Sequence, residues 1–373
     1  MIDMRVKLED VCERGSSNLK QSDVMDKTGE YPIYGAAGYL GNVDFYHQEK
    51  SYVAVVKDGA GVGRTTLHPA KSSVIGTMQY LLPKENVLPE YLCYVVRYMH
   101  LEKYFTGATI PHIYFKDYKN EEFNLDTLEQ QMEIVSILKK VENVIESRQQ
   151  ELQKLDELIK ARFVEMFGDS VVNPMKWEEM NISRVVGGKI SNGFFAKRDD
   201  YCEDGNVSVL GVANVVNRMY SNYTGLPKTN GTEIDIKKFA VKYGDLLFCR
   251  SSLVAEGIGK ASVVPRCVPD NTLFECHVIR LPLDLKMVVP EYLQVLSTMD
   301  YFRNQIIAQS KTATMTTIGQ DGILKCNILL PPLELQKEFL TFIEQVDKSK
   351  VAVQKALDET QLLFDSLMQK YFG

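Results

Sequence analysis

The segment KDGAGVGRTT, at residues 57–66, combines three glycines with Lys57 and Arg64, a composition that could bind phosphate. A Walker A loop requires a glycine, four residues of any type, and then Gly-Lys followed by Ser or Thr. Asp58 stands where the first glycine is required, and Arg64 replaces the lysine. The segment AEGIGKAS, at 255–262, also departs from this pattern. We therefore interpret both segments as turns beside strands, where glycine supplies backbone conformations that other residues avoid.

The sequence lacks the residue patterns of common catalytic and metal sites. Its five histidines form no HExxH motif and no zinc-type spacing with cysteine, and no GxSxG elbow occurs. The segment NPMK, at 173–176, departs from the Asn/Asp-Pro-Pro-aromatic pattern with which adenine methyltransferases hold a flipped base. We predict that this chain is not an enzyme, holds no metal and carries no cofactor of its own.

Length and composition indicate a multidomain cytoplasmic protein. A chain of 373 residues suggests two to four domains. No apolar run approaches the ~20 residues of a membrane span, and an N-terminus charged from Asp3 onward argues against a secretory signal. The seven cysteines form no CxxC pair or disulfide-like spacing, which is typical of reduced thiols.

The net charge of −6 argues mildly against nucleic-acid binding, because phosphate contacts require cations. The excess is concentrated in two segments, 126–169 and 332–373, which together carry 17 acidic and 11 basic side chains. The remainder of the chain balances at 32 of each sign. The electrostatic objection to nucleic acid therefore applies to those two segments and not to the rest.

The same two segments are an internal repeat. LDTLEQQMEIV, at 125–135, aligns without a gap to LPPLELQKEFL, at 330–340, with a constant shift of 205 residues. The alignment continues for about 44 residues, to Phe167-Gly168 and Phe372-Gly373. Neither copy contains an internal glycine or proline, and both are rich in Glu, Lys, Gln and Leu. We expect each copy to be one long helix that ends at its glycine.

Apolar residues recur three and four positions apart along both predicted helices, a spacing typical of a coiled-coil seam. Polar residues interrupt the two seams at different places, Arg148 in the first helix and Lys350 in the second. This mismatch favours pairing of the two helices with each other, although two independent surface helices are an alternative. The residues predicted to pair are Leu138, Val141, Ile145, Leu152, Leu155 and Ile159, and Ile343, Val346, Val353, Leu357 and Phe364.

Shorter and weaker sequence repeats precede each helix. LPEYL (88–92) matches VPEYL (289–293), GVGR (61–64) matches GIGK (257–260), and VKLEDV (6–11) matches MNISRV (180–185) weakly. The shift grows from 174 to 205 residues, so the second half has about 31 extra residues, mostly before Gly257. Strand-like runs such as SYVAVV and DLLFC, glycine-rich turns and one amphipathic helix in each half (89–105 and 290–307) predict an α+β fold with a mixed or antiparallel sheet.

This organisation resembles the specificity subunit of Type I restriction–modification systems, in which each of two variable domains precedes a helix that opens with Leu-Pro-Pro-Leu-x-x-Gln. The resemblance covers nearly the whole chain, and the helical repeats carry it most specifically. Asp126-Thr127 replaces the double proline in the first copy. Further segments look like two classes of target-recognition domain: YPIYGAAGYLG (31–41), VVKDGAGVG (55–63) and GATIPHIYFKD (107–117), and then VSVLGVANV (207–215) and YGDLLFCRSS (243–252).

The resemblance implies two target-recognition domains, 1–124 and 170–330, separated by helical spacers at 125–169 and 331–373 that pair as an antiparallel coiled coil. Each domain would read one half of a split site in double-stranded DNA. The helices would dock two modification subunits, which bring S-adenosylmethionine and methylate adenine, and restriction subunits can join that complex. A helix of 40 residues is roughly 60 Å long, comparable with half-sites one to two DNA turns apart, about 35–70 Å.

Candidate DNA contacts are cations, hydroxyls and amides on the expected loops, because such groups bind phosphates and base edges. For any single lysine or arginine an ordinary solvated charge is the simpler explanation. Tyr34 could pack on a sugar or cap the core, and Asp199-Asp200 weaken the field of the neighbouring cations. The candidates are Tyr34, Gly35, Lys57, Arg64, Lys71, Thr109 and His112, and then Lys197, Arg198, Asn214, Arg218, Arg250, Ser251, Lys260, Lys311 and Thr314. Thr314 belongs to TATMTT (312–317), which offers four hydroxyls on an expected loop.

Two other classes of function remain open from the sequence. A coiled-coil scaffold whose domains bind protein or carbohydrate fits the near-zero net charge of the two domains. It would not retard DNA in a gel even at low salt, whereas a specificity subunit would. A methyltransferase in its own right lacks its catalytic motif here.

Overall fold

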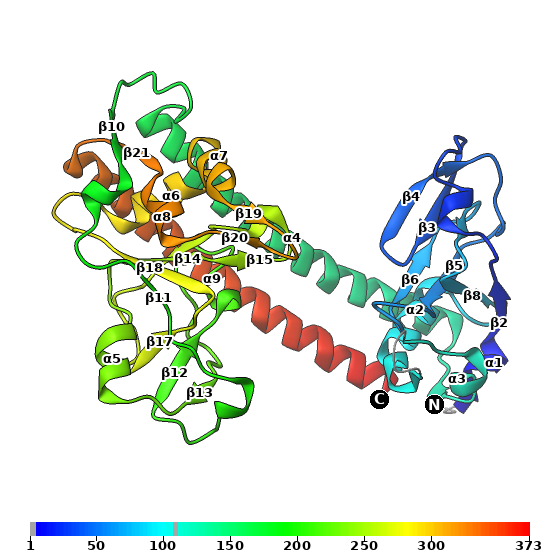
Figure 1. Ribbon diagram of the computed structural model, residues 1–373. Helices are drawn as coiled ribbons and strands as arrows, with labels where there is room; N and C mark the ends of the chain where they lie inside the picture. Colours follow the sequence, from blue (N-terminus) through cyan, green and yellow to red (C-terminus); the bar gives the residue numbers. More distant parts are fainter. Residues whose placement is uncertain (1–4, 107–110) are drawn as a thin grey trace. The chain divides into compact units, whose positions relative to one another are not determined.

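The computed structural model describes residues 5–106 and 111–373, which form two compact units. The first unit comprises Met1–Glu151 with Val353–Gly373, and the second comprises Leu152–Ala352. Two 40-residue helices, α4 (Leu128–Phe167) and α9 (Leu333–Phe372), each contribute one part to each unit. These bounds confirm both helices of the internal repeat (Figure 1).

The first unit is built on a four-stranded antiparallel sheet with the order β2-β8-β5-β6 and a three-stranded sheet with the order β4-β3-β7. A two-stranded ribbon, β1-β9, joins its ends. The strands are β1 (Arg5–Lys7), β2 (Cys12–Ser16), β3 (Tyr31–Gly35), β4 (Gly38–Val43), β5 (Tyr52–Val56), β6 (Thr65–His68), β7 (Ser73–Val74), β8 (Met78–Pro83) and β9 (Glu122–Asn124). The short helices are α1 (Leu8–Val11), η1 (Gln21–Asp23), α2 (Pro89–Tyr98), η2 (Leu101–Tyr104) and α3 (Phe115–Tyr118).

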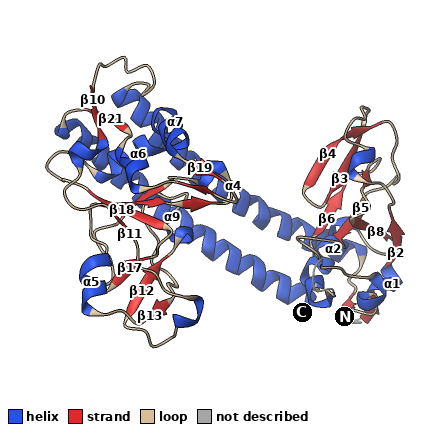
Figure 2. Ribbon diagram, viewed as in Figure 1, coloured by secondary structure: helices blue, strands red, loops and turns tan. Residues whose placement is uncertain are grey.

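The second unit repeats this plan with the orders β11-β18-β14-β16, β13-β12-β17 and β10-β21, and adds the small sheet β15-β20-β19. Its strands are β10 (Glu178–Asn181), β11 (Ser191–Asn192), β12 (Val207–Leu210), β13 (Lys228–Thr229), β14 (Asp245–Cys249), β15 (Ser251–Ser252), β16 (Ala261–Val263), β17 (Thr272–Phe274), β18 (Val278–Pro282), β19 (Lys311–Thr312), β20 (Thr316–Thr317) and β21 (Asn327–Leu330). Its helices are η3 (Ile182–Val185), η4 (Arg198–Asp200), η5 (Val212–Asn214), α5 (Glu233–Phe239), η6 (Ala255–Gly257), α6 (Pro290–Thr298), α7 (Asp300–Gln309) and α8 (Gln320–Leu324). Strands and helices mix in both units (Figure 2), which confirms the α+β prediction.

Strand register shows that the two units share one topology. Val6 pairs with Phe123 in the ribbon β1-β9, and Met180 pairs with Ile328 in β10-β21. Met180 follows Val6 by the predicted shift of 174 residues, and Ile328 follows Phe123 by the predicted shift of 205. The weak match of VKLEDV to MNISRV is therefore confirmed. The three-stranded sheets agree as well, because β3-β7 and β12-β17 are both parallel pairs. A tight turn joins β3 to β4, whereas residues 211–227 separate β12 from β13, which places much of the extra length before Gly257.

A buried glutamine fixes each long helix to its own domain. Gln131 accepts a hydrogen bond from the backbone N–H of Leu88, the residue before α2, at 2.8 Å. Gln336 accepts the equivalent bond from Val289, the residue before α6, at 2.9 Å. Both side chains are 0% exposed. The Gln of the Leu-Pro-Pro-Leu-x-x-Gln phrase therefore satisfies a buried donor at a helix start.

The two long helices pack together in opposite directions. In the first unit, Leu138 of α4 shares a buried cluster with Met368 and Phe372 near the end of α9. In the second unit, the rings of Phe167, near the end of α4, and Phe339, near the start of α9, lie 5.4 Å apart at 90°. Every residue of the predicted seam is buried or half-buried (Leu138, Val141, Ile145, Leu152, Leu155, Ile159, Ile343, Val346, Val353, Leu357 and Phe364).

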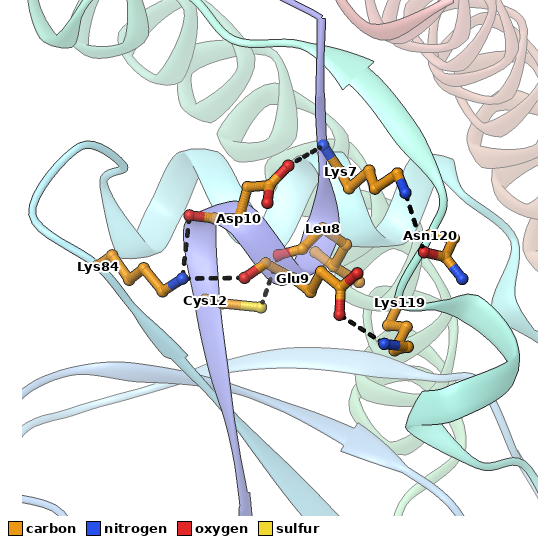
Figure 3. Close-up of polar contacts among 8 residues, drawn as sticks. All are labelled: Lys7, Leu8, Glu9, Asp10, Cys12, Lys84, Lys119 and Asn120. Atoms are coloured by element: carbon orange, nitrogen blue, oxygen red, sulfur yellow. Dashed lines mark hydrogen bonds and ion pairs between the residues drawn. The ribbon is translucent and has the colours of Figure 1, made fainter.

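Polar contacts fix α1 at the start of the first domain (Figure 3). The Lys84 ammonium donates to the backbone carbonyls of Glu9 and Asp10 at 2.9 and 3.2 Å. Lys119 pairs with the Glu9 carboxylate at 2.7 Å. Lys84 thus satisfies carbonyls that a four-residue helix cannot satisfy internally, and the ion pair of Lys119 adds a second contact that holds α1 to its neighbours.

The single amphipathic helix expected near the end of each domain is interrupted in both. In the first unit α2 ends at Tyr98, and His100 follows with a left-handed φ of +51°. In the second unit Met299 is extended and separates α6 from α7. The apolar periodicity continues across each break, which is why the sequence pattern did not reveal it.

Candidate nucleic-acid interface

Lys57 and His112 of the first unit lie together beside an acidic partner. Lys57 directly follows β5, and its Nζ lies 3.8 Å from the Asp58 carboxylate. His112 Nδ1 contacts the same carboxylate. Backbone bonds from Gly59 to Pro111 and from Ile113 to Lys57 join the two loops. The structure therefore brings two predicted residues to one place, where the Asp58 carboxylate offsets the positive charge of Lys57.

Arg64 connects this region to the end of β3, because its Nη2 donates to the Ala36 carbonyl at 2.7 Å. Tyr34 and Gly35 lie in strand β3, not in a turn, which corrects the expectation from IYGAAG. The Tyr34 ring is half-buried 4.4 Å from the His68 ring and packs on the core, and Gly35 is buried. A buried glycine in a strand offers DNA no side chain, so Gly35 is the weaker candidate of the two.

The remaining candidates of this unit are separate or undescribed. Lys71 is exposed in the turn after β6, at the other end of that strand from Arg64. Thr109 lies outside the described residues. Two nearby residues were not among the candidates: Tyr114 is 48% exposed, and the Lys116 ammonium lies 5.1 Å from its ring centroid. The aromatic and basic residues of PHIYFKD were the available signal for them.

In the second unit, several candidates meet at the small sheet β15-β20-β19. Ser251 pairs in register with Thr317, which also pairs with Lys311. The Ser251 hydroxyl lies 3.1 Å from His277 Nδ1, and the Arg250 guanidinium donates to the Cys276 carbonyl at 3.1 Å.

The predicted threonine loop is mostly a hairpin in this sheet. Its strands are β19 and β20, and the hydroxyls of Thr312 and Thr316 bond to each other at 3.0 Å. Thr316 is buried, whereas Thr314 is exposed near the turn. This mutual bond therefore occupies two of the four hydroxyls that were expected to be available.

Lys260 and Arg218 form a separate group. The Lys260 ammonium donates to Asn217 Oδ1 at 2.6 Å, and Arg218 donates to the carbonyls of Val216 and Ala213. Lys160 of α4 and Arg303 of α7 line the same cavity and were not among the candidates. No local sequence signal links these two residues to it, because the fold brings them from distant elements. Burial lowers the pKa of the Arg303 guanidinium.

Three candidates have local structural roles. Asn214 Oδ1 accepts from the Gly211 N–H at 3.1 Å and so caps η5. Lys197 precedes η4, and its backbone N–H donates to Asp200 Oδ2 at 2.7 Å. Arg198 is exposed beside Asp199 and Asp200, so the carboxylates dilute its positive charge as expected.

Residues 5–106 and 111–373 contain neither a cluster of metal ligands nor a helix that could span a membrane. These residues contain no group of three or more His, Cys, Asp or Glu side chains placed to bind a metal ion. None of their helices combines the length and apolar character that crossing a bilayer requires.

An internally repeated protein of two α+β domains, joined by two helices that pack in opposite directions, is a recognisable architecture. The sequence matches the Type I restriction modification DNA specificity domain twice, over residues 3–157 and 174–360. The chain therefore belongs to this family of specificity subunits.

Known proteins agree with this assignment. The chain is 23% identical to the Type I restriction enzyme MjaVIII specificity subunit of Methanocaldococcus jannaschii, over 82% of this chain and 76% of that protein. It is 29% identical to the EcoKI specificity subunit of Escherichia coli, over 38% of this chain and 31% of that protein.

Solved structures share the fold. The S subunit of the Type I restriction–modification system from M. genitalium superposes with a TM-score of 0.56 at 12% identity, covering 99% of this chain and 96% of that chain. A chain from a structure of complex assembly and conformational transition in the type I R-M system superposes with a TM-score of 0.51 at 15% identity, covering 98% and 96%.

Proposed function

We propose that this chain is the DNA sequence-specificity subunit of a Type I restriction–modification complex and has no catalytic activity of its own. Each domain reads one half of a bipartite site in double-stranded DNA. Phosphate contacts position each domain, and side chains that reach base edges select the sequence. Because the two domains differ in sequence, the two half-sites differ as well.

The repeated topology carries this proposal. Arg64 and Lys260 precede the equivalent strands β6 and β16, and each bonds to the loop that follows the equivalent strand β3 or β12. The second unit adds the insertion after β12 and the sheet β15-β20-β19. One framework that presents a cation at the same place with different surrounding loops suits two related domains that read different sequences.

The long helices supply the spacing. Each has 40 residues, or roughly 60 Å at 1.5 Å per residue. That length suits half-sites separated by one to two turns of DNA, about 35–70 Å. Exposed apolar residues remain on the first unit's part of the helices, including Met132 at 55% and Leu362 at 69% exposure. We propose that the helices dock two modification subunits, which bring S-adenosylmethionine. We also propose that the complex is cytoplasmic.

The decisive experiment is a methylome. The chain is expressed with its modification subunit in a host without DNA methylation, and long-read sequencing maps N6-methyladenine, with the modification subunit alone as control. A split motif with two unlike halves and a fixed gap, present only with this chain, is the expected result. Exchange of residues 1–124 for those of another specificity subunit should then change one half of the motif only.

The opposite result is equally clear. If both proteins are expressed and associate but no motif depends on this chain, the specificity role is wrong. A scaffold that binds protein or carbohydrate would then be the better interpretation. Retardation of a DNA duplex at low salt separates the two directly, because a scaffold should leave the duplex unshifted.

A further inference from the structure

A cavity of about 360 Å³ lies within the second unit. It is lined by α4, by residues 217–219, by the start of β16, and by the helices α6 and α7, and it is open to solvent. Ile159, Val295 and Ala261 contribute apolar surface to its lining. Its volume is within the range of small-ligand sites, about 300–1,000 Å³.

The polar lining of the cavity is strongly basic. Four cationic side chains contribute to it, against one carboxylate, that of Asp156. Asp156 is already paired with Lys350 of α9 at 2.7 Å. Such a concentration of positive charge is unusual in a protein whose net charge is −6. The four cations are Lys160, Arg218, Lys260 and Arg303.

The hydrogen bonds of three of these cations position them without neutralising them. Lys260 donates to the amide oxygen of Asn217, while Arg218 and Arg303 donate to backbone carbonyls, which are uncharged acceptors. Within residues 5–106 and 111–373, none of the four cations forms an ion pair with a carboxylate. Like charges held together cost free energy, so an anion among them would stabilise the arrangement.

The internal repeat shows that the fold does not require this charge. The shift of 205 residues aligns Lys160 of α4 with Asp365 of α9. The shift of 201 residues aligns buried Phe302 with buried Leu101, and therefore Arg303 with Glu102. Two of the four cations thus have carboxylates as counterparts in the first unit. Lys260 corresponds to another cation, Arg64, so the second unit differs from the first in the additional charges of Lys160 and Arg303.

We propose that this cavity is a phosphate-binding site. Two arginines and two lysines match the charge and the several acceptor oxygens of a phosphate group, and the apolar residues of the lining can contact the carbon skeleton attached to it. The phosphate comes either from the DNA backbone or from a free nucleotide. Binding of a DNA phosphate rests on the function proposed above, whereas binding of a free nucleotide does not.

The test uses the full chain with Lys160→Glu combined with Lys260→Gln. Glutamine can still donate to Asn217, and Lys160 is exposed on a helix, so the variant should keep its fold. Lys160→Glu alone serves as a milder second variant. Lys286→Glu is the matched control, because Lys286 is exposed outside the cavity. Lys160→Arg with Lys260→Arg retains the charge and should restore binding.

The first measurement titrates pyrophosphate and dAMP into the chain alone by calorimetry at constant ionic strength. The second measures the affinity of the complex with its modification subunits for a duplex containing its methylated motif, between 50 and 300 mM KCl. If free phosphate is the ligand, the Lys160→Glu, Lys260→Gln variant binds these compounds at least tenfold more weakly. If DNA is the source, the slope of log affinity against log salt falls by about one for each phosphate that the variant no longer neutralises.

If the cavity binds phosphate, the weaker binding or the smaller salt slope appears in the Lys160→Glu, Lys260→Gln variant and not in Lys286→Glu. Unchanged titrations together with an unchanged salt slope would overturn the phosphate site, even if the methylome confirms the specificity role. If the methylome shows no motif, the titrations with pyrophosphate and dAMP alone decide the proposal. The two hypotheses therefore fail separately.

Discussion

The side-chain carbonyl of Gln336 accepts a hydrogen bond from the backbone N–H of Val289 at 2.9 Å, in a position where Gln336 is 0% exposed. The same amide group donates to the Pro331 carbonyl at 2.8 Å. One residue of α9 thus holds the start of α6 and the entry into α9 itself. Gln131 repeats this arrangement with Leu88 and Asp126 in the first unit.

Replacing Gln336 by alanine should therefore destabilise the second unit. The change leaves two buried backbone groups without partners, each costing about 1–3 kcal/mol, so we expect a loss of about 2–5 kcal/mol. Urea unfolding followed by circular dichroism measures it. Gln150→Ala, at an exposed position of α4, should change the midpoint negligibly. Equal midpoints for both variants would show that the buried amide is not structurally important.

Leu138→Ala tests whether the predicted seam holds the helix pair. Leu138 is 0% exposed and shares a cluster with Phe372 of α9, so truncation should cost about 2–5 kcal/mol. Val144→Ala, where the side chain is 42% exposed on the same helix, should cost less than about 1 kcal/mol. Thermal unfolding compares the two. Similar losses would show that Leu138 stabilises the helix pair no more than an exposed residue does.

Gly63→Ala tests why the glycine-rich segment needs its glycines. Gly59 and Gly63 have φ angles of +85° and +86°, but they differ in surroundings. A Cβ at Gly63 would lie 2.6 Å from the backbone nitrogen of Glu102, whereas a Cβ at Gly59 would meet nothing within 4 Å. Gly59→Ala should cost about 1–2 kcal/mol from backbone strain. Gly63→Ala should cost at least about 1 kcal/mol more, and chemical denaturation of the two variants measures the difference.

The stability of the first unit should fall as the pH drops below neutral because of His68. Burial beside Tyr34 and Tyr52 lowers the pKa of His68 from 6.5 to about 4. The folded state therefore resists a proton that the unfolded state accepts. Its stabilising contribution is present above pH 6.5 and is lost as the pH falls toward 4, by about 3 kcal/mol in total.

His68→Gln removes this dependence, so its loss of stability between pH 7 and pH 4.5 should be smaller than that of the wild type. Urea midpoints at several pH values provide the comparison. A His68→Gln profile parallel to the wild type would show that His68 is not the group responsible.

The long-range plan of this protein can be predicted from its amino-acid sequence. The gapless repeat indicates the bounds of α4 and α9, because helix formers without glycine or proline leave few alternatives over 40 residues. Apolar spacing identifies the paired face, and the changing shift indicates two equivalent domains. These features are periodic, so they can be recognised without knowledge of contacts.

The local sites depend on how distant elements pack in the folded chain. Nothing in the sequence near Lys160 or Arg303 indicates that both line one cavity with Lys260, since α4, α7 and β16 meet only after folding. Likewise, Gly35 seemed available on a turn but is buried in β3, and the hairpin ladder occupies part of TATMTT. Periodicity records which face of an element is buried, whereas a binding site requires side chains from several elements to converge.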